Sequence, residues 1–178
     1  MTQRILVAID RSPARAPVLQ QGMRLAQALG ANLMLMHVLS AYDDDSPGLP
    51  MRAYHSYYPI VDSAAWEMYQ QRWEAYENSG LTDLQLLAEE ATARGIPTEF
   101  TQNTGDPGRV ICDMAKTWNA DLILMGHRGR KGLSELLLGS VSSYVMHHAP
   151  CSVLIVRSVP KPTEPEAAEA PAVSVTEG

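Results

Sequence analysis

Four short apolar segments are spaced along the chain, and they limit its possible folds more than any other feature. They are Ile5–Ile9, Asn32–Leu39, Asp121–Met125 and Ser152–Val156, and each is an almost unbroken apolar run. Such runs, rich in β-branched residues, are typical of strands buried on both faces of a parallel sheet. Because both faces of such a sheet must be covered by helices, the segments predict an α/β protein.

The residues between these segments have the spacing of helices. Ser12 is a suitable N-cap and Pro13 a suitable first residue for a helix that Gly30 ends. Asp106–Pro107 begins another helix, and Ser140–His148 forms a short one. With Thr98–Gln102 as a further strand, the order of elements predicts a doubly wound sheet of five parallel strands with right-handed crossovers.

The longest predicted helix covers residues 61–94 and carries a stripe of aromatic residues. The stripe consists of Trp66, Tyr69, Trp73 and Tyr76, which recur three and four residues apart. Such a stripe could be part of a cofactor site, but the spacing is more typical of a helix face that packs on the core. Gly80 is expected to break or bend this helix.

Two stretches are predicted to lie outside the folded core. Residues 40–59 are polar and rich in turn-forming residues, which indicates an excursion from the core. Residues 158–178 are rich in proline, alanine and glutamate and lack periodic apolar residues, so we expect a disordered acidic tail. Residues 1–157 would then form a single domain.

Composition and charge exclude several classes of protein. A hydrophobic content of 46% with 19% charged residues is typical of a globular chain, and the formal charge of −6 disfavours binding to nucleic acid or to an anionic membrane. No apolar run approaches the roughly 18 residues of a membrane helix, and the start of the sequence lacks a signal peptide, so we expect a cytoplasmic protein. Cys112 and Cys151 have no zinc-site spacing and are expected to be buried, reduced thiols.

Residues 126–142 contain the pattern that indicates function. Gly126 directly follows a predicted buried strand, and Gly139 directly precedes a predicted helix. Glycines allow positive φ and the close approach of an anion, and the first turn of a helix offers free N–H groups at the positive end of its dipole. The hydroxyls of Ser140 and Ser142 could add donors, and three cations between the glycines could offset phosphate charge: Arg128, Arg130 and Lys131.

Two common nucleotide-binding motifs are absent from this segment. Gly139 is followed by Ser140 without the lysine of a Walker loop, and two residues separate Gly126 from Gly129, which does not fit the dinucleotide-binding pattern. The glycines could also be simple connectors between a strand and a helix. The pattern that is present is Gly, two residues, Gly, nine residues, Gly-Ser.

This pattern resembles the ATP-binding motif of the universal stress protein family, and the resemblance extends over the folded chain. Residues 5–10, with the terminal Asp10, resemble the family's first strand, and Gly105–Pro107 resembles the start of its third helix. Residues 119–126 and 149–156 resemble its last two strands with the residues that lead into them. The residue after Asp10 departs from the pattern: Arg11 stands where the family commonly has a glycine, a small or an aromatic residue, and could reach the phosphates or crowd the pocket.

The resemblance implies a role for each matching residue. Ala8, Ile9 and Asp10 would face adenosine, Val38 would offer main-chain groups to the adenine edge, and Met125 and Gly126 would approach the ribose and α-phosphate. The phosphate chain would be held by Gly129, Gly139, Ser140, Val141 and Ser142.

The implied function is that of an ATP-binding stress protein that acts as a sensor or switch, with Mg²⁺ as a possible companion of ATP. Two alternatives stay open: a protein-interaction module that needs no nucleotide, and a binder of AMP or a cyclic nucleotide in the same pocket. The sequence shows no pairing of a nucleophile with a base, so we expect at most a weak ATPase. Ser152–Val156 is short, apolar and the last predicted strand, so it could pair edge to edge with the same strand of a second chain. We therefore expect a homodimer, which the resemblance also implies. An unidentified protein partner is expected in addition.

Overall fold

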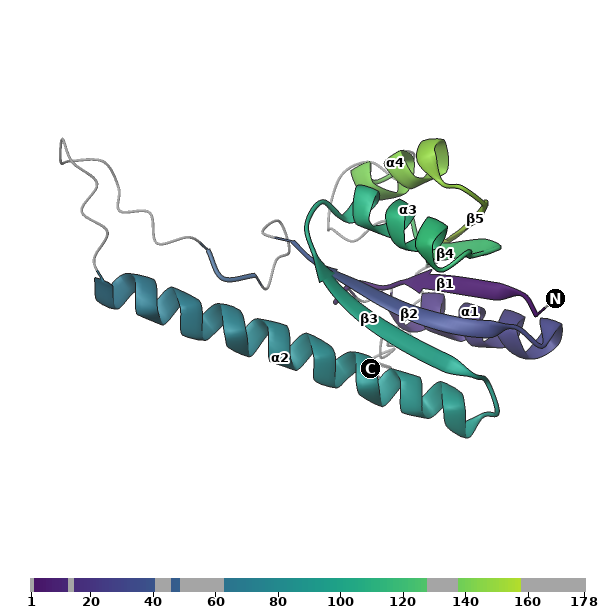
Figure 1. The fold of residues 1–178 in the computed structure, drawn as a ribbon, viewed down its shortest axis with the longest axis horizontal. Helices are drawn as coiled ribbons and strands as arrows, with labels where there is room; N and C mark the ends of the chain where they lie inside the picture. Colours follow the sequence, from purple (N-terminus) through teal and green to yellow (C-terminus); the bar gives the residue numbers. More distant parts are fainter. Residues whose placement is uncertain (1, 13–14, 41–45, 49–62, 128–137, 158–178) are drawn as a thin grey trace, which may run out of the picture.

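A computed structural model describes residues 2–12, 15–40, 46–48, 63–127 and 138–157. They form one parallel sheet of five strands in the order β3-β2-β1-β4-β5, with helices on both faces (Figure 1). The predicted doubly wound α/β fold is therefore confirmed. The predicted acidic tail, at 158–178, and most of the predicted excursion lie outside the described residues.

The elements follow the predicted order, with ends that differ from the prediction by two residues at most. They are β1 (Arg4–Ala8), α1 (Arg15–Leu29), β2 (Asn32–Leu39), α2 (Ser63–Ala93), β3 (Thr98–Thr104), α3 (Pro107–Thr117), β4 (Leu122–Gly126), α4 (Ser140–His148) and β5 (Ser152–Val156). Within the described residues α1 begins at Arg15; Pro13 lies outside them, so its predicted place at the start of this helix stays a prediction.

The sheet separates two apolar cores. Ile5 and Val7 of β1 face the core beneath α1 and α2, whereas Leu6 faces the core beneath α3 and α4. All three side chains are fully buried, because β1 pairs with β2 on one side and β4 on the other. This two-sided burial explains why the first segment of the sequence is apolar without alternation.

The ends of α1 and α3 confirm two sequence predictions. Gly30 ends α1 with a φ of 60°, and the amides of Gly30 and Ala31 donate to the carbonyls of Gln27 and Ala26. Such a left-handed residue satisfies carbonyls that the last turn of a helix leaves open. Asp106 caps α3, since its Oδ1 accepts a hydrogen bond of 3.1 Å from the amide of Arg109.

Gly80 does not interrupt α2, so the predicted break or bend is wrong. The helix runs without a gap through 31 residues, and Gly80 is buried against the neighbouring strands. A Cβ at this position would lie 2.2 Å from Gln102 Oε1 and 3.4 Å from His37 Nδ1. Gly80 therefore lies where the side chains of β2 and β3 come close to α2, and not at an end of the helix.

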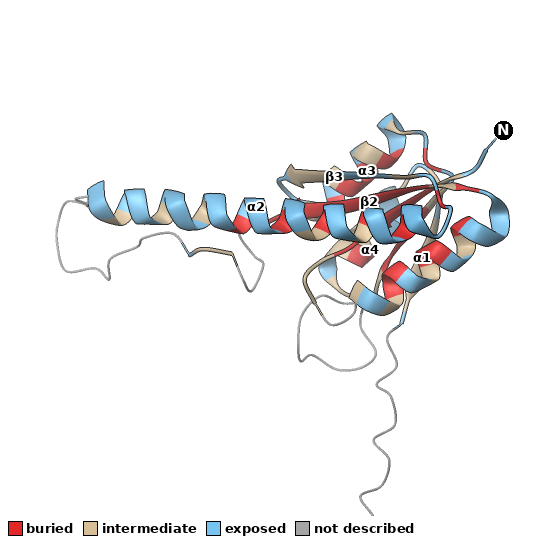
Figure 2. Cartoon of the chain, turned by 90° about the horizontal axis from the view of Figure 1, so that it is seen from below, coloured by how far each residue is buried: buried red, intermediate tan, exposed pale blue. Residues whose placement is uncertain are grey.

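The aromatic stripe of α2 lies only partly on the core, which corrects the second prediction for this helix. Tyr76 is buried, Tyr69 and Trp73 are half-buried, and Trp66 is 42% exposed. The amino-terminal part of α2 extends past the sheet in both views of the chain (Figures 1 and 2). Helical periodicity identifies an apolar face, but it does not determine how far the surface beneath that face extends.

Even α2 is not apolar enough to cross a membrane, and no other helix in the described part of the chain meets the requirement.

The contact at Gly80 gives a prediction for stability. Gly80→Ala should lower the free energy of unfolding by about 1 kcal/mol, because the loss of a hydrogen bond to buried His37 outweighs the higher helix propensity of alanine. Urea denaturation measures this change. In a Gln102→Ala background the same substitution should be neutral or stabilising; equal effects in both backgrounds would contradict the proposed clash.

Candidate functional site

The carboxyl ends of β1, β2 and β4 form one row at an edge of the sheet. Ala8 pairs with Met36 on one side and with Met125 on the other. Val38, Asp10 and His127 stand two residues after Met36, Ala8 and Met125, respectively. Because ligands of open α/β sheets bind at the carboxyl ends of the strands, where the strand order changes direction, this row is the candidate site.

Asp10 directly follows Ile9 in this row and is half-buried. Its Oδ1 accepts hydrogen bonds from the amide of Ser12 at 3.1 Å and from the Ser12 hydroxyl at 2.6 Å. These bonds fix the carboxylate in a tight turn at the start of the connection to α1. Among the described residues both hydrogen bonds go to Oδ1 and none goes to Oδ2.

The main-chain carbonyl of His127 joins the two ends of the glycine segment. It accepts hydrogen bonds from the Gly139 amide at 3.3 Å and from the Ser142 hydroxyl at 3.2 Å, and the same hydroxyl lies 3.0 Å from the Gly139 carbonyl. Ser142 is buried. We call these contacts of His127, Gly139 and Ser142 the clasp. It places the start of α4 next to the end of β4.

Among the described residues, the clasp leaves main-chain amides of the first turn of α4 without a partner. The Gly139 amide is engaged with His127, and the Ser143 amide donates to the Gly139 carbonyl at 2.9 Å. The amides of Ser140, Val141 and Ser142 lie between them, and the first amides of a helix have no partner within it. A phosphate at this position would also meet the positive end of the helix dipole.

Two details of this segment differ from the sequence-based expectation. Gly139 has φ −63° and ψ 157°, and Gly126 is not among the positive-φ glycines of the described residues, so neither is required for a left-handed conformation. The Ser142 hydroxyl is committed to the clasp, which leaves the Ser142 amide, and the exposed Ser140, for an anion.

Most of the predicted site residues come together at this edge. They are Ala8, Asp10, Val38, Met125, Gly126, Gly139, Ser140, Val141 and Ser142. Ile9 contributes only main chain there, because its side chain is buried in the core beneath α1 and α2 and its amide donates to the Met36 carbonyl. Arg128 and Gly129 lie outside the described residues.

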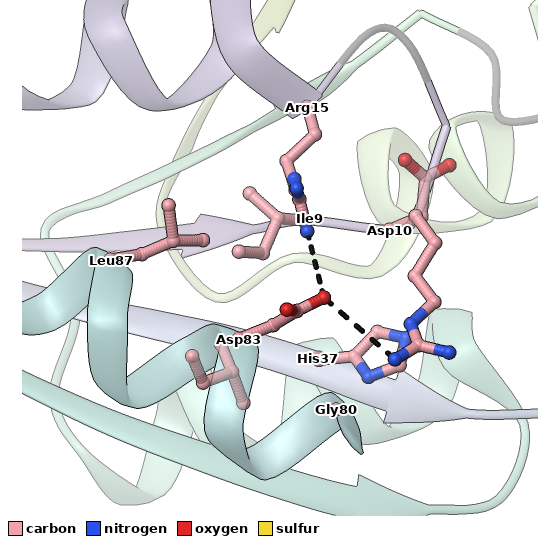
Figure 3. A pocket seen from close by; sticks show the side chains of 9 residues that line it. Ile9, Asp10, Arg15, His37, Gly80, Asp83 and Leu87 are labelled. Atoms are coloured by element: carbon pink, nitrogen blue, oxygen red, sulfur yellow. Dashed lines mark hydrogen bonds and ion pairs between the residues drawn. The ribbon is translucent and has the colours of Figure 1, made fainter. Parts of the chain in front are cut away.

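Arg11 is directed away from this edge, towards α2. Its guanidinium donates to the Ser79 hydroxyl, lies 3.7 Å from Asp83 and stands over the Tyr76 ring at 5.1 Å from the ring centroid. Arg15 also contacts Asp83, at 3.1 Å. Figure 3 shows these ion pairs across a narrow crevice between β1, β2, α1 and α2, with the Asp10 carboxylate pointing away from them. In this structure Arg11 neither reaches nor crowds the candidate site.

Asn103 is a residue of this edge that the sequence analysis missed. It pairs with Val38 in the register of β2 and β3, and its Oδ1 accepts a hydrogen bond of 3.0 Å from the Thr101 hydroxyl. The predicted strand ended at Gln102, one residue before it. Only the register between β2 and β3 could have identified it, and that register is not visible in a single sequence.

The two thiols are free and lie apart from the row of strand ends. Cys112 is buried, as predicted, whereas Cys151 is only half-buried. Burial raises the pKa of both thiols, and the negative charge of Asp113 adds to the rise at Cys112 and that of Asp121 at Cys151. A raised pKa disfavours the thiolate, which is the form that acts as nucleophile or metal ligand. Within the described ranges no three His, Cys, Asp or Glu side chains are placed to hold a metal ion.

Comparison with known proteins identifies a family. Residues 1–157 match the model of the universal stress protein family. The universal stress protein Sll1388 of Synechocystis is 39% identical over 154 residues, which cover 86% of this chain and 97% of the relative. Among solved structures, a universal stress protein UspA from Lactobacillus plantarum has a TM-score of 0.60 at 29% identity, covering 87% of this chain and 97% of the other.

Two further solved structures are complexes with nucleotides. A universal stress protein in complex with cAMP has a TM-score of 0.50 at 22% identity, covering 86% of this chain and 95% of that one. The universal stress protein from Archaeoglobus fulgidus in complex with dAMP has a TM-score of 0.52 at 19% identity, covering 86% and 96%. At these identities the likeness concerns the fold.

The clasp predicts different effects for two serines of α4. Ser142→Ala should lower the free energy of unfolding by about 1–2 kcal/mol, because it removes a buried donor from the carbonyls of His127 and Gly139. Ser140→Ala, at the exposed first residue of the helix, is the matched control and should change stability by less than about 0.5 kcal/mol. Urea denaturation compares them, and similar values would show that the clasp does not stabilise the fold.

Proposed function

The chain belongs to the universal stress protein family, and we propose that it binds an adenine nucleotide, ATP in the first place, at the carboxyl edge of β1, β2 and β4. The observation that carries this proposal is the open first turn of α4, held against the end of β4 by the clasp. Main-chain amides there can bind phosphate without a lysine. The complexes of related folds with cAMP and dAMP support the same class of ligand.

Each part of the nucleotide has a proposed partner. Oδ2 of Asp10 faces adenosine, and the main chain of Val38 meets the adenine edge. Ala8 and the main chain of Ile9 line the adenine side, and Met125 and Gly126 border the ribose and the α-phosphate.

The phosphate chain would lie on Gly139 and on the amides of Ser140, Val141 and Ser142. Gly129 and Arg128, which lie outside the described residues, stay predicted phosphate contacts. Mg²⁺ would enter as the complex with ATP, coordinated by phosphate oxygens, which Mg²⁺ prefers.

The role that follows is a sensor or switch in the cytoplasm. Binding of ATP to one state of the chain in preference to another would shift the population of states and so change its contacts with a protein partner. AMP or a cyclic nucleotide is the second candidate ligand, since the relatives' complexes contain cAMP and dAMP. Competition of AMP, cAMP and ATP for the same site ranks the ligands.

Gly139→Val tests the phosphate site. Isothermal titration with ATP and Mg²⁺ should give saturable binding to the unaltered chain, and the substitution should weaken it by about tenfold or more, because a branched side chain enters the space next to the amides. The fold should survive, since valine tolerates the φ of −63° at this position.

Gly48→Val is the matched control for this experiment. Gly48 is exposed with open space around its Cα, so affinity for ATP should not change. Retained affinity in the Gly139 variant, or no heat from the folded chain at millimolar ATP, would exclude the proposed site.

We also propose a homodimer through β5, the last strand of the sheet. Its residues Val153–Val156 are only half-buried, and its outer edge is free of other strands among the described residues. Light scattering at micromolar concentration should give about twice the 19.5 kDa of one chain. A stable monomer would contradict this arrangement.

A further inference from the structure

Arg11 directly follows a proposed ligand-binding residue, Asp10, yet its side chain is directed away from the candidate site. Its guanidinium contacts three residues of α2: the ring of Tyr76, the hydroxyl of Ser79 and the carboxylate of Asp83. They are three and four residues apart, so they lie along one face of the helix. We call these three residues the α2 support.

The core fixes α2 in place at the level of the support. Gly80 and Leu84 are buried on the side of the helix that faces the sheet, and Tyr76 is buried with them. A Cβ at residue 80 would lie only 3.4 Å from Nδ1 of His37 in β2, so the helix is close to this strand. A contact made with such a fixed element can hold another group in a defined place.

Arg11 is also the central residue of the turn that holds Asp10. Oδ1 of Asp10 accepts hydrogen bonds from the amide and the hydroxyl of Ser12, so residues 10–12 close a ring through the aspartate side chain. A rotation of the main chain at residue 11 would open this ring. Figure 3 shows the Asp10 carboxylate pointing away from the ion pairs at Asp83. An anchor on one side of the turn therefore determines the direction of the carboxylate on the other.

We propose that Arg11 is a positioning residue, which ties the turn to α2 and so holds the Asp10 carboxylate towards adenosine. This inference rests on the proposed function, in which Asp10 faces adenosine. The guanidinium itself does not touch the nucleotide. Because the support belongs to α2, a shift of this helix would also change the affinity for the nucleotide.

The combination of contacts carries the proposal, and not the ion pair alone. The side chains of Arg11 and Asp83 are 24% and 44% exposed, and an ion pair open to solvent contributes little to stability. A flat guanidinium can lie over the Tyr76 ring while its N–H groups reach Ser79 and Asp83 around its rim. Several partners around one rigid group restrict the arginine to one arrangement, and the turn is restricted with it.

The alternative is that Arg11 turns towards the phosphates when ATP binds. The guanidinium would then give up all three contacts with the support, and the Asp83 carboxylate would keep only the ion pair with Arg15, at 3.1 Å. The contacts of the structure therefore favour positioning. The two roles differ in the part of the nucleotide that they affect, so they can be separated by experiment.

Isothermal titration of the full chain with AMP and with ATP and Mg²⁺ tests the proposal. Arg11→Ala should weaken both nucleotides by the same factor, about fivefold or more, since the altered contact is with adenosine, which both contain. Arg15→Ala is the matched control, because it removes the same charge and an ion pair with the same carboxylate but lies outside the turn. It should change affinity by less than about twofold. Equal effects of the two variants, or a loss confined to ATP, would overturn the proposal.

Asp83→Ala separates support from charge. If charge alone mattered, removal of a carboxylate should strengthen the binding of an anionic nucleotide. The proposal predicts the opposite, a weakening of about twofold to threefold for AMP and ATP alike, because Arg11 loses one partner of three. Circular dichroism checks that the variants are folded. Tighter binding of ATP by this variant would assign the guanidinium to the phosphates and overturn the proposal.

The Ser12 amide reports on the turn in the absence of nucleotide. Because it donates to Oδ1 of Asp10 at 3.1 Å, its exchange with solvent, measured by NMR, should accelerate about fivefold or more in Arg11→Ala and stay unchanged in Arg15→Ala. Unchanged exchange in both variants would overturn the proposal even where nucleotide binds. An unaltered chain that binds no nucleotide would contradict the proposed function instead, and the exchange at Ser12 would still decide whether Arg11 holds the turn.

Discussion

β1 forms its main-chain hydrogen bonds with β2 on one side and β4 on the other, while its side chains enter a separate core on each face. Because β1 is central, the chain adds β2 and β3 on one side of it and then crosses back to add β4 and β5 on the other. As a result the strand order changes direction at β1, and the segments after β1, β2 and β4 begin at the same edge. Asp10, Val38 and His127 are neighbours for this reason, although they are far apart in the sequence.

The sequence was sufficient to predict the elements whose signals are local. Unbroken apolar runs predicted the strands, and Gly30 and Asp106 marked helix ends that the structure has. Contacts across long separations could not be predicted: Arg11 lies against Ser79 and Asp83, and Gly80 lies against Gln102. The same holds for the Ser142 hydroxyl, because the carbonyl that it contacts belongs to a residue on the other side of the glycine segment.

The chain as a whole is negatively charged, whereas the candidate site presents partial positive charge. The chain carries a formal charge of −6, yet the start of α4 presents oriented N–H dipoles to an anion. Long-range repulsion between the chain and a nucleotide is screened within about 10 Å at moderate ionic strength, whereas hydrogen bonds to amides act at contact. Local geometry can therefore bind phosphate in a protein that is acidic as a whole.

The clasp has a consequence for variation among related sequences. Since the Gly139 amide and the Ser142 hydroxyl both bond to the His127 carbonyl, the two ends of the intervening segment are joined within the folded body. Doubling the length of a segment with fixed ends costs only about 0.6 kcal/mol in closure entropy. A change of length between these ends should therefore leave α4 in place, so the fold by itself does not require the nine residues between Gly129 and Gly139.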